Sequence, residues 1–271
     1  MKKISHFIWF IRWLQRLGSA ALRHRKVIDL LPSLLVPQRR LLFDRRIGRL
    51  CTFKLRKQLS DYWAYDQCLA LSALDLDRFP QGRRLRERYE EMLAEGRAPL
   101  ILDCGANIGL STYWLAVEFP RALVLAVEPD SDNAHLAERN TRSCSNVRIV
   151  HGAVAAIDCR LSLTNADQGS DAFRTIPNMN GDVHGHSVAS LLAMGDGRAC
   201  DLLIAKIDIE GFESALFSSH TEWVDDACAI IVETHDWMLP GQATATNLLR
   251  ALSRERRDFL VDGEHVLSFR L

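Results

Sequence analysis

The sequence predicts an α/β fold in which a mainly parallel sheet of seven strands carries helices on both faces. Apolar runs of strand length alternate with helical stretches from residue 100 onward, and this alternation is typical of parallel sheets that are covered on both sides. A turn rich in small residues follows the first of these runs, at 103–109. Near the C-terminus, Asp262-Gly263 separates two apolar runs, and this pair favours a β-hairpin that adds antiparallel strands at one edge.

The periodicity places the elements of this fold in order along the chain. Strands of the sheet are expected at 100–104, 122–128, 147–151, 201–208 and 228–233, helices at 108–118, 131–142, 187–194, 211–219 and 243–255, and the hairpin at 258–270, with a further short strand near 160–164. The polar stretch Asn165–Gly185 is predicted to be irregular. An irregular insertion of that length is unusual unless it serves binding. His184 and His186, which flank Gly185, either reach a bound acceptor from a lid or fit solvated loop positions, and the second interpretation is favoured.

Two domains are expected: a basic, mostly helical N-terminal extension at 1–95 and a core domain at 96–271. The overall net charge of +0 hides an asymmetry, because residues 1–58 hold 15 Lys or Arg against two acids, a net charge of +13. The remainder holds 19 bases and 32 acids, a net charge of −13. A hydrophobic content of 48% and a charged content of 25% are those of a globular protein and exclude a disordered chain.

The sequence further predicts a cytoplasmic protein. Its seven cysteines form no C-x-x-C pair, which indicates reduced thiols rather than a disulfide framework or a metal finger. No apolar run has the length of a transmembrane helix, and no signal peptide is expected. Residues 1–25 resemble a basic amphipathic helix with tryptophans, which either lies at a membrane interface or packs on the core domain or another subunit.

The turn at 103–109 predicts a cofactor site. Gly105 and Gly109 allow close approach of a ligand, and Asn107 tolerates a left-handed backbone. A dinucleotide fingerprint would need glycines where the chain has Asn107 and Leu110. Asp103 ends the strand, and a carboxylate there suits a cofactor with an amino acid tail and a sulfonium. The pattern therefore favours S-adenosylmethionine over a dinucleotide.

Glu128 ends the next predicted strand, 25 positions after Asp103. A carboxylate at that place suits both hydroxyls of an adenosine ribose.

A second set of polar residues ends the fourth and fifth core strands. Lys206 and Asp208 share one face of the strand at 201–208, and a buried lysine needs a carboxylate partner, expected to be Glu210 or Glu233. Glu233 and His235 end the strand at 228–233. Because the carboxyl ends of parallel strands meet at one edge of the sheet, we expect chemistry there.

These motifs together resemble the FkbM family of methyltransferases. The resemblance covers residues 56–271 and is carried by Asp-Cys-Gly-Ala-Asn-Ile-Gly at 103–109, Glu128-Pro129, the motif at 206–213 and Glu-Thr-His at 233–235, with lesser support from 187–192 and 56–67. It implies a class I, Rossmann-like fold and methyl transfer from S-adenosylmethionine to a hydroxyl of a sugar, glycolipid or natural-product scaffold. The acceptor is thus expected to be a small molecule or a glycan.

The resemblance also assigns candidate residues to the cofactor. The amino acid side of the cofactor is assigned to Asp103, Gly105, Asn107 and Gly109. Glu128 is assigned to the ribose, and Gly152 and Ala153 to the surroundings of the adenine.

The candidate catalytic residues are His235, Asp208 and Glu210. His235 is the first choice as the base that removes the hydroxyl proton, because its ordinary pKa is near neutrality. Asp208 is the second choice, as base or as the group that orients the hydroxyl, and Glu210 is a partner for Lys206. A different interpretation places a divalent metal among these carboxylates, Glu233 and His235, and another makes them only a buried ion network.

Two other functions are consistent with parts of the sequence. An NAD-type oxidoreductase is disfavoured by Asn107 in the glycine pattern. A basic module could bind nucleic acid or anionic lipid through residues 1–58 and carry a core without catalytic activity. Nucleic acid is the less favoured partner, because the fourth core strand lacks the Asn/Asp-Pro-Pro-aromatic motif of many methyltransferases that modify bases.

Overall fold

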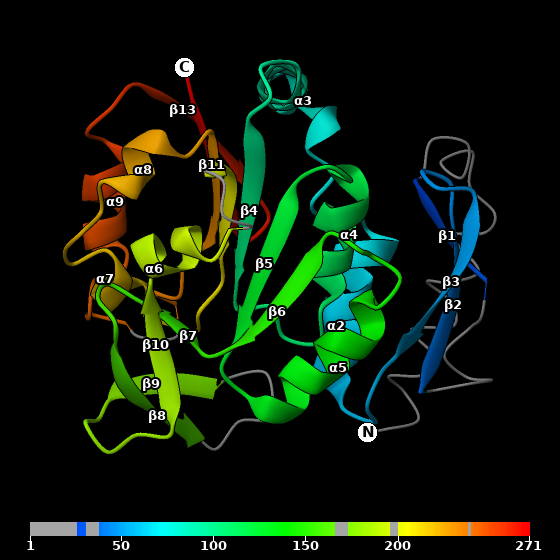
Figure 1. The fold of residues 1–271 in the computed structure, drawn as a ribbon. Coiled ribbons are helices and arrows are strands. Elements are labelled where there is room, and N and C mark those ends of the chain that lie inside the picture. Colours follow the sequence, from blue (N-terminus) through cyan, green and yellow to red (C-terminus); the bar gives the residue numbers. More distant parts are fainter. Residues whose placement is uncertain (1–25, 31–37, 166–172, 196–199, 238–239) are drawn as a thin grey trace. The chain divides into compact units, whose positions relative to one another are not determined.

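The computed structural model describes residues 26–30, 38–165, 173–195, 200–237 and 240–271 (Figure 1). The chain divides into two compact units, Met1–Leu74 and Asp75–Leu271. Helix α3 (Pro80–Ala94) therefore belongs to the second unit, whereas the sequence suggested a boundary after residue 95.

The described part of the first unit contains an antiparallel sheet of three strands followed by a helix. The strands are β1 (Val27–Asp29), β2 (Arg39–Asp44) and β3 (Arg49–Lys54), and helix α2 (Leu59–Tyr65) leads into a wider helical turn at Asp66–Ala70. The expectation of a mostly helical extension is wrong for these three strands.

Charged side chains hide the strand pattern of β2. Its buried positions are Arg40, Leu42 and Asp44, so the alternation does not appear as apolar against polar. The Arg40 guanidinium lies 5.2 Å from the ring centres of both Tyr62 and Tyr65, and such cation–π contacts stabilise a buried arginine.

The second unit contains the predicted seven-stranded sheet, with the order β13-β14-β12-β11-β4-β5-β6. Its strands are β4 (Ala98–Cys104), β5 (Leu123–Glu128), β6 (Val147–His151), β11 (Cys200–Ile207), β12 (Ala229–Glu233), β13 (Arg257–Asp262) and β14 (His265–Arg270). The first five are parallel to one another, and β14 pairs antiparallel with both β12 and β13. The hairpin predicted at Asp262-Gly263 is confirmed, with Gly263 in the left-handed region at φ +61°.

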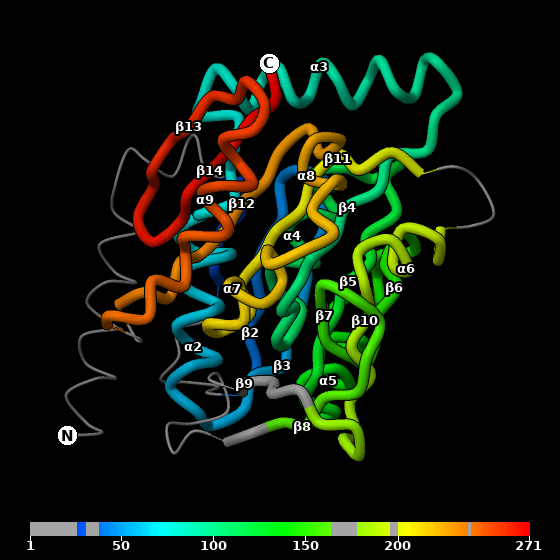
Figure 2. Tube along the Cα trace, turned by 90° about the vertical axis from the view of Figure 1, so that its left-hand side faces the viewer, coloured from blue at the N-terminus to red at the C-terminus, as the bar shows by residue number. Residues whose placement is uncertain are grey.

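Helices cover both faces of this sheet, as predicted (Figure 1). One face carries α4 (Leu110–Glu118) and α5 (Ser131–Thr141), and the other carries α6 (Val188–Ala193), α7 (Glu213–Leu216), α8 (Trp223–Asp226) and α9 (Thr246–Leu252). Helix α3 lies across the end of the sheet where β4 begins (Figure 2). The predicted helix at 211–219 is shortened to α7, and α8 was not predicted.

A second, four-stranded sheet overturns the expectation that Asn165–Gly185 is irregular. Its strands are β7 (Ala153–Ala155), β8 (Cys159–Asn165), β9 (Phe173–Pro177) and β10 (Val183–Ser187), in the order β7-β10-β8-β9. The inward positions of β10 are Val183 and Gly185, and a Cβ at Gly185 would lie 2.8 Å from Cys159 Sγ. A strand with glycine at an inward position shows no apolar alternation, which explains the wrong prediction.

In the part of the chain that the structure describes, no helix combines the length and the apolar character needed to cross a membrane. The amphipathic helix expected at 1–25 lies outside the described residues.

Candidate active site

The turn after β4 has the backbone that the sequence predicted. Gly105 and Asn107 are left-handed, with φ of +83° and +49°. The N–H groups of Gly105 and Ala106 both donate to the carbonyl oxygen of Val127, at 3.0 Å. A Cβ at Gly105 would lie 1.8 Å from the carbonyl oxygen of Asp208. Gly105 is therefore required where the ends of β4 and β11 approach each other.

Two other glycines assigned to the cofactor serve packing. A Cβ at Gly109 would lie 2.8 Å from the Cα of Ala137, so Gly109 brings the start of α4 against α5. A Cβ at Gly152 would lie 2.7 Å from the carbonyl oxygen of His184, next to the pairing of β7 with β10. Neither glycine lines the cavity beside the turn.

That cavity lies at the carboxyl ends of the parallel strands. Its polar lining includes Asn107, Glu128, Asp208 and Glu210, at or just beyond the ends of β4, β5 and β11, and Asn133 in the first turn of α5. Of the residues assigned to the cofactor, four line it: Gly105, Asn107, Glu128 and Ala153. The structure thus brings the cofactor candidates and two catalytic candidates to one cavity.

Glu128 is buried and held by three hydrogen bonds. Its Oε2 accepts from the backbone N–H of Asn107 at 2.8 Å. Its Oε1 accepts from the backbone N–H of Asp130 at 3.0 Å and from the side-chain amide of Asn133 at 3.1 Å. Burial raises the pKa of Glu128 to about 7, although these donors oppose the shift. Glu128 therefore titrates near neutral pH.

The side-chain oxygen of Asn107 is buried and, among the described residues, accepts no hydrogen bond. A buried acceptor without a donor is costly. Since Asn107 lines the cavity beside Glu128, a ligand with hydrogen-bond donors would satisfy both groups. This observation fits a cofactor that carries an ammonium group and ribose hydroxyls.

Asp103 lies beneath the turn rather than in the cavity lining. Its side chain is fully buried, and its Oδ2 accepts hydrogen bonds from the hydroxyls of Ser111 at 2.8 Å and Thr112 at 2.7 Å. Its Oδ1 lies 3.4 Å from Lys206 Nζ. We did not predict the contacts of these two hydroxyls from the sequence. Their position in the first turn of the helix after Asp103 is the only sequence feature that indicates them.

Lys206 has two carboxylate partners, Asp103 and Asp208, that were not expected. Its Nζ lies 3.3 Å from Asp208 Oδ2 and 3.4 Å from both Asp103 Oδ1 and the carbonyl oxygen of Gly105. The expected partners were Glu210 or Glu233. Asp103 meets Lys206 because β4 and β11 are neighbours in register, whereas Glu210 lies beyond the end of β11 in a left-handed turn.

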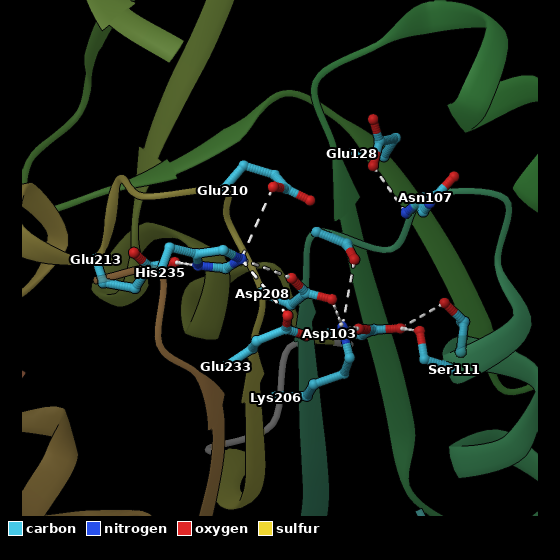
Figure 3. A network of polar contacts seen from close by, with 12 residues as sticks. Asp103, Asn107, Ser111, Glu128, Lys206, Asp208, Glu210, Glu213, Glu233 and His235 are labelled. Atoms are coloured by element: carbon cyan, nitrogen blue, oxygen red, sulfur yellow. Dashed lines mark hydrogen bonds and ion pairs between the residues drawn. The ribbon is translucent and has the colours of Figure 1, made fainter. Parts of the chain in front are cut away.

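His235 is buried at the end of β12 and held by Glu213, as Figure 3 shows. Its Nδ1 lies 2.8 Å from Glu213 Oε1. Its Nε2 faces three carboxylates, at 3.7 Å from Asp208 Oδ1, 3.7 Å from Glu210 Oε2 and 3.9 Å from Glu233 Oε1. We expected from the sequence that His235, Asp208 and Glu210 would lie near one another, and they do. The sequence gave no indication of the role of Glu213.

The carboxylates shift the pKa of His235. Burial alone would lower it, but the hydrogen bond with Glu213 and the charges of Asp208 and Glu210 raise it to about 9. An imidazole with this pKa carries both protons near neutral pH, which argues against its expected role as general base. Burial and the charge of Asp208 raise the pKa of Glu233 to about 7. Burial opposes ionisation of Asp208, but Lys206 and His235 keep its pKa below the ordinary value.

The order of the seven strands, with its antiparallel hairpin at one edge, is that of the class I, Rossmann-like methyltransferase fold. The family model of the Methyltransferase FkbM domain matches residues 103–261. The chain belongs to this family, as the resemblance of its motifs implied.

Comparisons with individual proteins give more distant likenesses. No curated protein matches the chain. Among solved structures it is similar to monomeric WbdD, with 12% identity, a TM-score of 0.38 and coverage of 69% of this chain but only 40% of that one. It is also similar to a putative caffeoyl-CoA O-methyltransferase from Staphylococcus aureus, with 13% identity, a TM-score of 0.40 and coverage of 69% and 83%. A putative O-methyltransferase from Klebsiella pneumoniae shows 16% identity, a TM-score of 0.40 and coverage of 78% and 99%.

Proposed function

We propose that this protein transfers a methyl group from S-adenosylmethionine to a hydroxyl of a sugar, glycolipid or natural-product scaffold. One observation carries the proposal. The cavity that presents Glu128 and Asn107 to a cofactor is also lined by the carboxylates of Asp208 and Glu210. An acidic wall accepts hydrogen bonds from an uncharged hydroxyl compound and disfavours an anionic acceptor.

Four residues would hold the cofactor, which supplies a methyl group activated by a positive sulfur. Glu128 would accept hydrogen bonds from the ribose hydroxyls, and Asn107 Oδ1 would accept one from another polar group of the cofactor. Gly105 and Ala153 leave the room that backbone contact requires. The acidic residues of the cavity favour the positive charge of the sulfonium.

The protein's own part in the transfer is to align the hydroxyl and to favour loss of its proton. Bound S-adenosylmethionine would supply the methyl group and keep the electron pair of the broken carbon–sulfur bond on sulfur, and the hydroxyl proton would pass to the carboxylate, Asp208 or Glu210, that accepts its hydrogen bond. Asp208 and Glu210 would accept the hydrogen bond of the incoming hydroxyl and orient it. His235 is only 2% exposed and does not line the cavity, so we assign it to positioning these two carboxylates.

Calorimetry with the full chain tests the proposed function. S-adenosylmethionine and its demethylated product should both bind, whereas NADH should not. A comparison of metabolites and glycolipids between a deletion strain and the wild type should then show an acceptor that lacks one methyl mass. Absence of affinity for both cofactor forms would refute the proposal.

Replacing His235 with alanine should separate turnover from cofactor binding. We expect the dissociation constant for S-adenosylmethionine to change less than about threefold, because His235 lies outside the cavity lining. The kcat for the acceptor should fall about 10²-fold, the loss that a misplacement of the orienting carboxylates by about 1 Å can cause. Steady-state kinetics give kcat and KM separately, and a variant with unchanged kcat would exclude His235 from the reaction.

Affinity for S-adenosylmethionine should weaken as the pH falls below about 7. The pKa of Glu128 is raised to about 7, so below that pH the carboxyl is protonated in the free protein. A protonated carboxyl cannot accept hydrogen bonds from both ribose hydroxyls, so the dissociation constant should rise toward tenfold per pH unit. Calorimetry between pH 5 and about 7 gives the slope.

The matched control is Glu128→Gln, which keeps the shape of the side chain and cannot ionise. It should bind more weakly than the wild type at neutral pH, with the pH slope removed. An equal slope in the wild type and in Glu128→Gln would assign the titration to another group.

A further inference from the structure

We propose that the carboxyl ends of β11 and β12 form a binding site for a divalent cation. The ligands are Asp208 Oδ1, Glu233 Oε1 and His235 Nε2, with Glu210 Oε2 beside them. The cation's effect on an acceptor hydroxyl rests on the proposed function, but binding of the cation does not.

The donor atoms are spaced as ligands around one ion. One ligand atom from each of Asp208, Glu233 and His235 lies within 4.8 Å of the others. From Nε2, the three carboxylate oxygens lie at 3.7–3.9 Å. These separations are too long for hydrogen bonds. Ligands each about 2.1 Å from an octahedral ion are about 3 Å apart when adjacent and about 4.2 Å apart when opposite, so small shifts of the carboxylates would bring these atoms onto one ion.

The imidazole of His235 gives a second, independent indication. The side chain is 2% exposed, and among the described residues no hydrogen-bond partner reaches Nε2, whereas Nδ1 is held by Glu213 at 2.8 Å. A carboxylate on one imidazole nitrogen fixes the ring and makes the other nitrogen a better ligand, which is the usual surrounding of a metal-bound histidine. With Nδ1–H donated to Glu213, Nε2 faces three carboxylates, and their charge favours either a second ring proton or, in exchange for that proton, a metal cation between them.

The charges around the cluster leave the ligand side negative. Lys206 Nζ lies 3.3 Å from Asp208 Oδ2, which is the oxygen away from His235, and 3.4 Å from Asp103 Oδ1. Asp208 Oδ1 instead faces Nε2 together with Glu210 and Glu233 (Figure 3). Lys206 thus balances charge on one side of Asp208, and a cation that displaces the Nε2 proton would balance it on the other.

Three carboxylate oxygens and one imidazole nitrogen suit Mg²⁺ or Mn²⁺. Asp208 and Glu210 also line the cavity, so an ion held here would adjoin the place proposed for the acceptor. A divalent ion lowers the pKa of a hydroxyl bound to it, which would aid loss of the proton that methyl transfer requires.

Titration of the full chain with Mn²⁺, followed by the loss of the free-ion electron paramagnetic resonance signal, tests the site without the cofactor. The wild type should bind one Mn²⁺, and Mg²⁺ should compete. Glu233→Gln and Asp208→Asn each remove a ligand charge and should raise the dissociation constant at least tenfold. Glu213→Gln leaves the ligands in place but loosens His235, and should raise it about 10–100-fold.

Glu264→Gln is the matched control. Glu264 is exposed and its charge acts on Glu233, but it is not among the proposed ligands. Its replacement should change the dissociation constant less than about twofold, because a single exposed charge is largely screened.

Two results would overturn the proposal: a wild type that does not bind millimolar Mn²⁺, or equal effects of Glu233→Gln and Glu264→Gln. Thermal unfolding shows which variants are folded, and either ligand variant alone suffices for the decision. Calorimetry with S-adenosylmethionine on the same preparation separates the two proposals. Cofactor binding without Mn²⁺ binding refutes only the cation site, and the reverse result refutes only the proposed function.

Discussion

Replacing Asp103 with alanine is expected to lower the free energy of unfolding by about 3–5 kcal/mol, the usual cost of removing one partner from a buried ion pair. Asp103 is fully buried, and the change leaves Lys206 without one of its carboxylates. It also leaves the hydroxyls of Ser111 and Thr112 without their acceptor. Urea unfolding of the variant and the wild type measures the difference.

Two further variants show whether the buried charge is the cause. Asp103→Asn keeps hydrogen-bond acceptors but loses the charge, so its cost should be smaller than that of alanine. Adding Lys206→Met to Asp103→Ala removes the opposing charge and should recover part of the loss. A stable Asp103→Ala protein that has lost only cofactor affinity would instead support the direct cofactor contact that the sequence suggested.

Replacing Gly105 with alanine is expected to lower the free energy of unfolding by about 2–5 kcal/mol. A left-handed residue with a Cβ costs about 1–2 kcal/mol, and overpacking adds about 1–3 kcal/mol. The new Cβ would lie 1.8 Å from the carbonyl oxygen of Asp208, so the turn after β4 must move away from β11. Affinity for S-adenosylmethionine should fall with it, because Gly105 lines the cavity. Urea unfolding and calorimetry measure the two effects.

Gly96→Ala provides the control for strain without a clash. Gly96 is also left-handed, at φ +73°, and a Cβ there would have nothing within 4 Å. Its replacement should cost only the left-handed strain, about 1–2 kcal/mol, and leave cofactor affinity unchanged. Equal losses for the two alanine variants would mean that the approach of the strand ends at Gly105 contributes nothing.

The core of the second unit was predictable because its strands are buried on both faces. Leu100, Ile101 and Leu102 are fully buried, and such strands are continuous apolar runs in the sequence. The terminal hairpin was predictable for a different reason, since Asp262-Gly263 carries its own turn chemistry. Local signals therefore sufficed for the main sheet.

The strands that were missed are those whose inward positions are not apolar. In β2, Arg40 and Asp44 occupy buried positions, and Arg40 is stabilised there by aromatic rings about 20 residues further along the chain. In β10, glycine occupies an inward position. When a buried polar residue of a strand is stabilised by residues far along the chain, the strand shows no alternation of apolar and polar residues in the sequence.

The site was predictable in its members but not in its connections. The positions of Glu128, Asp208 and His235 follow from the rule that strand ends gather at one edge. The burial of Asp103 and the contact of Glu213 with His235 depend on how helices pack against that edge, and spacing along the chain does not encode such packing. Contacts of this kind decide which carboxylates are free to bind a ligand.

Strand β7 pairs parallel with β10, with Ala153 opposite Gly185 and Ala155 opposite Ser187. Residues 156–184 therefore form an insertion between two neighbouring strands. The chain departs and returns at neighbouring points, so the intervening segment can change in length or sequence without any shift of the seven-stranded framework. Phe212, which lines the cavity, packs against the apolar cluster of that segment. Grafting a related segment between Ala155 and Gly185 would thus change what packs behind Phe212 while the seven-stranded sheet stays in place.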